Sequence, residues 1–157
     1  MVRKLFSKIF LYISVLLVFN TSVFAETKTL QLSSEAKFGT DSGSTLTQED
    51  VTWTATTLSG AIRNTFNTAN YSGQQFGTSS AAWTGSFSAT FSESVVSVDV
   101  MANTGGEADL SVSVGGTTFK CNSQDVANVE KKSNTTPNTY RFVGSGSGAV
   151  VVSVANT

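Results

Sequence analysis

Carboxylates are the side chains with which this sequence could carry acid–base chemistry. The chain has no histidine and one cysteine, which excludes Ser-His-Asp and Cys-His nucleophile systems and the usual zinc sites. A glycosidase needs only two carboxyl groups about 5–10 Å apart, and the candidates are Glu93, Asp99, Glu107 and Asp109. We interpret these side chains as solvated charges, because surface carboxylates are common and nothing in the sequence marks a cleft. The sequence therefore predicts a non-catalytic protein, with a carboxylate glycosidase as the alternative.

Carboxylates could also bind a metal ion. Calcium favours oxygen ligands on loops, and Asp41, Asp50, Glu107 and Asp109 could supply them. Their spacing follows no recognisable ligand pattern, so we expect no cofactor, and a structural calcium ion is the alternative. The sequence also lacks a glycine-rich loop followed by Lys-Ser or Lys-Thr, which would indicate phosphate binding.

Sugar recognition depends on exposed aromatic rings that stack on the sugar and on amide side chains that bind its hydroxyl groups. Trp53 and Trp83 alternate in phase with other apolar residues, so we expect both in the core. Tyr71 is the better candidate because polar residues surround it in an expected loop. We therefore predict a ligand site at Tyr71, Asn70 and Gln74. The alternative is that Tyr71 only covers the edge of the fold.

Alternation of apolar and polar residues predicts strands with one buried and one wet face. The strongest local signal is a β-hairpin over residues 110–120, with Gly115-Gly116 as its two-residue turn. Other strands are expected at residues 28–32, 51–55, 83–91, 96–100, 140–142 and 150–154. Residues 144–148, Gly-Ser-Gly-Ser-Gly, are expected to form a hairpin turn, and residues 125–129 a helical turn in a long loop. Threonines alternate at residues 52–56 as on ice-binding faces. The sequence has no regular Thr-x-Thr repeat across strands, so we do not expect a flat array of threonines.

About eight strands without an amphipathic helix predict an all-β fold, a two-sheet antiparallel β-sandwich. We favour a jelly roll over an immunoglobulin-like sandwich, because the paired cysteines and strand-centred tryptophan of immunoglobulin domains are absent. Cys121 shares the phase of Phe119, so we expect a buried thiol. One cysteine allows no internal disulfide, and core packing must stabilise the fold.

The first 25 residues have the order of a secretory signal peptide. Basic residues precede an apolar run at residues 9–19, and small residues lead to Ala25. We predict cleavage after Ala25 and a secreted or extracytoplasmic protein. The apolar run is shorter than the ~20 residues that span a bilayer, so stable membrane insertion is not expected. The remaining domain, residues 26–157, is mildly acidic and poor in charge, which argues against nucleic acid as a partner.

Six segments combine strand and turn patterns in a familiar order. They are Trp53-Thr-Ala-Thr, Gln75-Phe-Gly-Thr-Ser-Ser, Val95-Val-Ser-Val-Asp-Val, residues 110–119, Tyr140-Arg-Phe and Gly148-Ala-Val-Val-Val-Ser-Val. Together they resemble the carbohydrate-binding-module-like jelly-roll domains of secreted bacterial proteins. The resemblance implies a module that binds glycan, a cell-surface polymer or another extracellular ligand through loops. The alternative is a structural or adhesive cell-surface domain that acts through protein contacts.

Domains of this appearance often continue beyond the Gly- and Val-rich strand into one more strand. The resemblance therefore implies that the domain, which stops at Thr157, lacks a final strand that would otherwise cover an edge or fill the core. The alternative is a complete domain in which residues 28–32 already fill that place. The sequence does not decide the oligomeric state.

Overall fold

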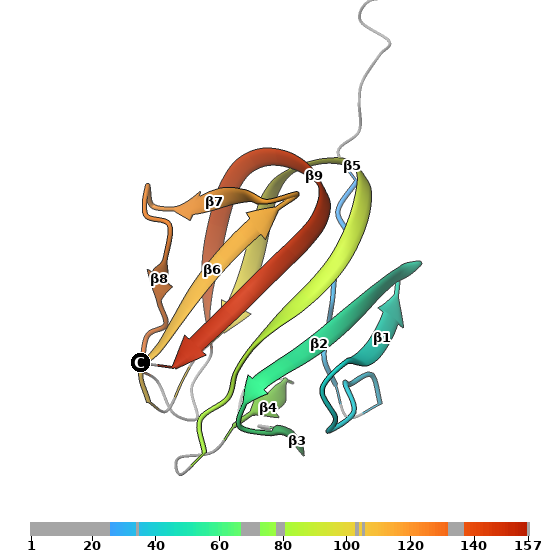
Figure 1. Ribbon diagram of the computed structural model, residues 1–157, viewed down its shortest axis with the longest axis vertical. Coiled ribbons are helices and arrows are strands. Elements are labelled where there is room, and N and C mark those ends of the chain that lie inside the picture. The colour runs from blue at the N-terminus through green and yellow to red at the C-terminus, as the bar shows by residue number, and fades with distance from the viewer. Residues whose placement is uncertain are drawn as a thin grey trace, which may run out of the picture.

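The computed structural model describes residues 26–33, 35–66, 73–77, 81–102, 104, 106–131 and 137–156, and every regular element in this part of the chain is a β-strand (Figure 1). The strands are β1 (Ser44–Gln48), β2 (Val51–Ser59), β3 (Ile62–Phe66), β4 (Gln74–Phe76), β5 (Thr84–Ala102), β6 (Ala108–Val114), β7 (Thr117–Cys121), β8 (Ala127–Asn128) and β9 (Asn138–Asn156). No helix of the described residues is long and apolar enough to cross a membrane. The predicted signal peptide lies outside the described residues.

All strand pairs are antiparallel, which confirms the predicted fold class at the level of an all-β antiparallel protein. Seven strands form one sheet in the order β1-β2-β5-β9-β7-β6-β8, and β9 also pairs with β6. β3 and β4 form a separate small sheet. The large sheet contains the candidate surfaces for function.

Two long strands fold this sheet over on itself. β5 and β9 are 19 residues each and pair from Gly85↔Val154 to Ala102↔Asn138. They bend together at the top of Figure 1, where the register shifts between residues 91 and 97 of β5. The bend divides the sheet into two layers. The first layer contains β1, β2, β6, β8, residues 84–91 of β5 and residues 148–156 of β9; the second contains β7, residues 95–102 of β5 and residues 138–143 of β9. The predicted two sheets are thus halves of one continuous sheet.

The predicted hairpin turn at residues 144–148 is wrong, because β9 continues as one bent strand through this Gly-Ser segment. The glycines are needed there for close contact with the β6–β7 hairpin. A Cβ atom on Gly144 would lie 2.5 Å from Cδ1 of Phe119, and one on Gly115 would lie 2.1 Å from the carbonyl oxygen of Ser147. Both distances are far below van der Waals contact. The glycines therefore allow the strand to bend over the hairpin tip rather than to reverse.

Three other local predictions also differ from the structure. Residues 28–32 form no strand; Thr29 and Gln31 instead donate their backbone N–H groups to the side chains of Glu49 and Gln48, both at 2.7 Å. The predicted helical turn at residues 125–129 is wrong, because β8 pairs there with β6. β1 is not among the strands expected from the sequence, because four of its five residues are polar and it lies beside a turn-rich segment.

The β6–β7 hairpin confirms the strongest prediction from the sequence. Val112 pairs with Phe119 and Val114 with Thr117. The φ angles of the turn glycines, 54° at Gly115 and 82° at Gly116, are both positive. Positive values at both central residues match the twist of the paired strands.

The core between the layers is built from the inward side chains of the alternating strands. Trp53, Trp83 and Cys121 are buried, as predicted. Phe119 and Phe142 are fully buried, and burial of such a side chain contributes roughly 1.5–3 kcal/mol. A second group of rings joins the small sheet to the large one, with Phe38, Phe76, Trp83 and Phe87 in contact at centroid distances of 4.9–5.6 Å. The Trp83 indole also donates to the hydroxyl of Thr57 at 2.8 Å.

A substitution at Gly144 tests the close approach at the bend. We expect Gly144→Ala to lower the free energy of unfolding by about 1–3 kcal/mol, because the new methyl group overlaps the buried ring of Phe119. Gly106→Ala is the control, since a Cβ atom there meets nothing within 4 Å, and its effect should stay within about 0.5 kcal/mol. Urea unfolding monitored by circular dichroism measures both. Equal stability of the two variants would contradict the packing described here.

A second substitution tests the turn between β1 and β2. Glu49 and Asp50 have φ angles of 50° and 62°, a region that disfavours residues with a Cβ atom. We expect Asp50→Gly to raise the free energy of unfolding by about 0.5–1 kcal/mol in urea unfolding. Asp41→Gly is the control, because the φ of Asp41 is not positive; it should be neutral or slightly destabilising. Stabilisation by both glycines would show that the turn geometry is not the cause.

Candidate functional site, a hydroxyl-lined face of the sheet

Of the three residues predicted to form a ligand site, Asn70, Tyr71 and Gln74, the structure describes only Gln74. Asn70 and Tyr71 lie outside the described residues. Gln74 is not in a loop, as the sequence suggested, but is buried in β4 at 8% exposure. Its amide oxygen accepts from the N–H of Phe38 at 2.9 Å, and its amide nitrogen donates to the carbonyls of Phe38 and Arg63 at 2.9 and 3.0 Å. The polar atoms of Gln74 therefore bind the backbone of a neighbouring segment.

Of the carboxylates considered for catalysis, Glu93 and Asp99 lie on β5, whereas Asp109 lies on β6 and Glu107 directly precedes it. Asp99 forms an ion pair with Arg141, whose Nη1 lies 3.6 Å from Oδ2 of Asp99 in the second layer. Asp109 lies on β6 and accepts a hydrogen bond from the side chain of Asn128. Glu93 lies at the bend of β5. Among the described residues, no three His, Cys, Asp or Glu side chains come together as a metal-ligand set.

A shallow pocket of about 440 Å³ lies between the segment that precedes β1 and the β1–β2 turn. It is lined by Thr29, Gln31, Ser33, Ala36, Gln48 and Glu49. The amide of Gln48 already accepts from the N–H of Gln31 and donates to its carbonyl at 2.8 Å, and Glu49 accepts from Thr29. These polar groups hold the segment that precedes β1 against the β1–β2 turn.

A broad surface of the first layer has a more distinctive chemistry. We call it the hydroxyl face, and it consists of the outward side chains of β1, β2, β5, β9 and β6 on the side turned to the viewer in Figure 1. Its hydroxyl-bearing members are Thr45, Thr47, Thr52, Thr54, Thr56, Ser86, Ser88, Thr90, Ser111, Ser113 and Ser153. Val151, Ala149 and Ala155 lie among them.

The strand registers place these hydroxyl groups in rows across the sheet. One row joins Thr56 to Ser86, Ser86 to Ser153 and Ser153 to Ser111. A second row crosses five strands as Thr45, Thr54, Ser88, Val151 and Ser113. Neighbouring strands are about 4.8 Å apart, so the second row extends across about 19 Å.

The side chains of this face are short and uncharged. A hydroxyl group donates one hydrogen bond and accepts two, and the branched threonine side chain is stiff at χ1. The Thr47 and Thr52 hydroxyls bind each other at 2.9 Å across the β1–β2 pair. The face is therefore a fixed array of neutral donors and acceptors, with the carboxylate of Asp109 near one edge.

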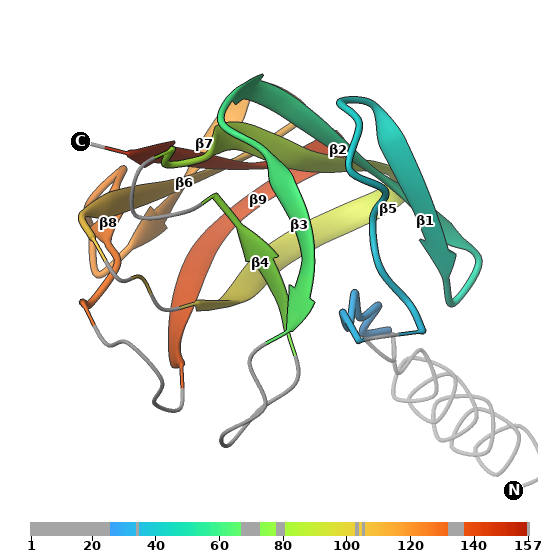
Figure 2. The same cartoon turned by 90° about the horizontal axis from the view of Figure 1, so that it is seen from below.

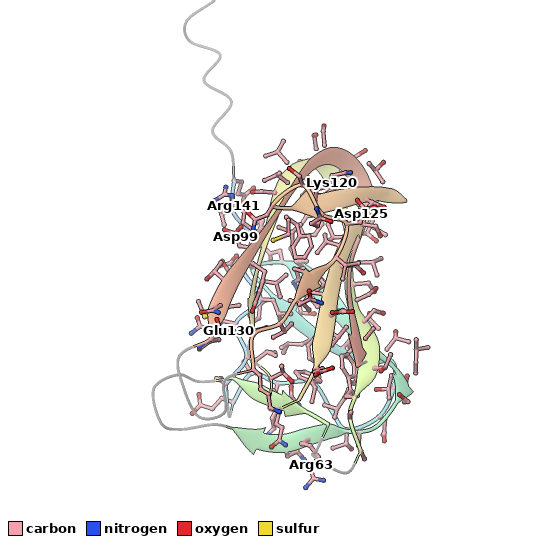
Figure 3. The ribbon with its side chains drawn as sticks, turned by 90° about the vertical axis from the view of Figure 1, so that its left-hand side faces the viewer. Arg63, Asp99, Lys120, Asp125, Glu130 and Arg141 are labelled. Atoms are coloured by element: carbon pink, nitrogen blue, oxygen red, sulfur yellow. The ribbon has the colours of Figure 1, made fainter. Side chains whose placement is uncertain are left out.

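Charged side chains gather on the other layer and on the rims of the molecule. Figure 3 shows Asp99 beside Arg141, and Lys120 beside Asp125. Lys120 Nζ lies 3.3 Å from Oδ1 of Asp125. A ligand at the hydroxyl face would thus meet a surface that is close to neutral.

No protein-family model matches this chain, and neither does any curated protein or solved structure. The comparisons therefore identify no relative from which a ligand could be inferred. Any function has to be argued from the surface itself.

The sequence predicts some of the residues of the hydroxyl face but not their arrangement in rows. The alternation at residues 51–55 and 83–91 predicts which side chains of each strand face solvent. No sequence repeat indicates that the hydroxyl groups of the different strands lie side by side. The alignment of the hydroxyl groups in rows depends on the pairing of β5 with both β2 and β9. The register between strands so far apart in the sequence cannot be predicted from the sequence of each strand alone. The rows follow from the fold.

A substitution at Gln74 tests its structural role. We expect Gln74→Met to lower the free energy of unfolding by about 2–4 kcal/mol, because the N–H and carbonyl of Phe38 lose their partner in a buried setting. The neighbouring Gln75 is exposed, so Gln75→Met is the control and should change the stability by less than about 1 kcal/mol. Thermal and urea unfolding measure both variants. A Gln74→Met protein of unchanged stability would mean that the amide serves another purpose.

Proposed function

We propose that this protein is a non-catalytic extracellular module, a jelly-roll type of sandwich, that binds a neutral carbohydrate polymer on its hydroxyl face. The observation that carries the proposal is the alignment of short hydroxyl side chains in rows across the strands of the first layer. The N-terminal pattern of a secretory signal peptide supports an extracellular place of action.

The chemistry of the face favours a polysaccharide over a charged ligand. Sugar hydroxyls, like those of Ser86 and Ser153, both donate and accept hydrogen bonds. A neutral face offers no attraction to nucleic acid or to an anionic polymer, whose binding depends on Lys and Arg contacts. The absence of described aromatic side chains from the face means that recognition proceeds by hydrogen bonds, since Trp53 and Trp83 point into the core.

The shape of the face favours a polymer over a small sugar. Small ligands are usually held in concave pockets that enclose most of their surface, whereas this site is an open sheet face about 19 Å across. An extended chain could contact several strands in succession and add many weak hydrogen bonds. We therefore place binding on the sheet face, where the sequence alone suggested the loops.

A structural or adhesive domain that acts through protein contacts is the second candidate. Large apolar side chains on the outward side of the second layer favour it, because Val96, Met101 and Val143 are 59%, 67% and 51% exposed. Exposed apolar patches of this kind mark protein contacts when they are contiguous. Concentration-dependent association without affinity for any polysaccharide would favour this candidate.

Binding to insoluble neutral polysaccharides tests the proposal. We expect Ser86→Ala/Ser88→Ala to weaken binding about tenfold, because each lost hydrogen bond contributes roughly 0.5–1.5 kcal/mol. Thr139→Ala is the control, since this threonine is exposed on the second layer, and its binding should be unchanged. Depletion isotherms on a panel of neutral and acidic polysaccharides measure the affinities.

The dependence on salt gives a second readout of the same proposal. Binding through a neutral face should vary little between low and high ionic strength, because exposed charges are screened and uncharged hydroxyls are not. Failure to bind any neutral polysaccharide in the panel would count against the proposal. A preference for acidic polymers that weakens with salt would also contradict it.

A further inference from the structure

The second half of β5 has an unpaired edge. Residues 95–102 pair with β9 on one side, and no described strand pairs with their other side, because β2 reaches β5 only at residues 84–88. We call this stretch the free edge. At about 3.4 Å per residue it is roughly 27 Å long, and Figure 2 shows this half of β5 running alongside β9 below the first layer.

The free edge has only two of the devices that usually protect an edge strand, the register shift where it begins and the charge of Asp99. Such edges are short, are covered, or carry lysine and proline. The other ends of the large sheet follow this rule, since β8 has two residues and the segment at Thr29 and Gln31 binds the β1–β2 turn. The free edge carries one charge, Asp99, and that charge is paired with Arg141 on β9. Among the described residues, no strand pairs with the backbone donors and acceptors along this edge.

The core beneath the free edge is less completely covered than the rest. Val112, Val114 and Val150 in the first layer are 0–2% exposed. By contrast, the inward side chains of the free edge, Val95, Val98, Val100 and Ala102, are only partly buried against the core. An added strand would bury the exposed parts of these side chains, at about 25 cal/mol per Å² of apolar area.

The segment before β1 lies near the start of the same edge. Leu30 and Leu32 pack against the core and are partly buried. Hydrogen bonds from its own backbone and from the Ser92 side chain lower the pKa of Glu93, and the charge of Lys28 adds to the effect.

A buried donor without an acceptor lies in the same region. The indole Nε1 of Trp53 has no hydrogen-bond partner among the described residues. The ring of Trp53 contacts Phe91 at a centroid distance of 6.1 Å, and Phe91 is the last residue of β5 before the register shifts at the bend. A buried donor of this kind usually has a partner.

We propose that the free edge of β5 accepts an extended strand of a partner polypeptide in which aliphatic and polar residues alternate. Backbone hydrogen bonds to residues 95–102 give affinity, as in other cases of strand addition. Aliphatic side chains on the inward positions pack against Val98 and Val100, while polar ones face solvent beside Ser97 and Asp99. A lysine or arginine opposite Asp99 complements the one carboxylate of the edge.

This inference does not depend on carbohydrate binding, because the free edge and the hydroxyl face lie on different layers. The test uses the full chain and a fluorescein-labelled decapeptide of alternating valine and threonine with lysine at both ends. We expect saturable binding with one peptide per protein and a rise in Tm of a few degrees at saturating peptide. Tryptophan emission should change on binding, and this change should be lost in Trp53→Phe, which retains Trp83.

Two control peptides separate strand addition from general apolar adhesion. The first has the same composition with its valines in one block, and the second carries N-methyl groups on alternate residues, which removes backbone donors without changing the side chains. Both should bind at least tenfold more weakly. Equal binding of all three peptides, or no saturable binding of the alternating one, would overturn the proposal.

Protein variants locate the peptide. Val98→Thr/Val100→Thr replaces two methyl groups with hydroxyls at nearly equal volume and should weaken binding about fivefold or more. Val151→Thr, on the hydroxyl face, is the matched control and should bind as the unchanged protein does. If the double variant does not fold, the N-methylated peptide still tests the proposal on the unchanged protein. Light scattering that shows a dimer which excludes the peptide would assign the edge to a second copy and overturn the proposal.

Discussion

The close approach of β9 to the tip of the β6–β7 hairpin is the contact on which the rest of the structure depends. At this point Gly144 lies against the ring of Phe119, Gly146 against Val114, and Gly115 against the backbone of Ser147. The N–H of Gly115 donates to the carbonyl of Ala149 at 2.9 Å. Side chains at these positions would push the strand away from the hairpin. Because β5 is paired with β9 along its whole length, both strands bend where the glycines allow it, and two layers result.

The features of this fold that could be predicted from the sequence are those determined by neighbouring residues, and the ones that could not depend on contacts between distant residues. The hairpin with its two glycines, the alternation of β2 and the burial of Trp53 and Trp83 could be predicted because short-range patterns determine them. The run of glycine and serine at residues 144–148 has the composition of a turn, and only its contact with a distant hairpin makes it a bent strand. Gln74 was misplaced for a similar reason, since its partners lie 36 and 11 residues away. The hydroxyl rows likewise require a register that local sequence does not contain.

The two layers differ in what they present to solvent. The first layer shows neutral hydroxyls on strands that are all paired, so its surface is rigid and offers side chains rather than backbone. The second layer shows ion pairs, three exposed apolar side chains and one unpaired backbone edge. Side-chain arrays suit a ligand with repeating hydroxyl groups, and an unpaired edge suits a polypeptide. One bent sheet thus carries two kinds of surface without extra domains.

The position of β9 also governs when this protein can fold. It is the last of the nine strands among the described residues, yet it lies between β5 and β6 in the first layer and between β5 and β7 in the second. Until β9 emerges from the ribosome, these strands have no common neighbour, and the chain cannot close its core. Contacts of such long sequence separation form slowly. The eight strands that precede β9 therefore remain without a closed core until β9 has been synthesised.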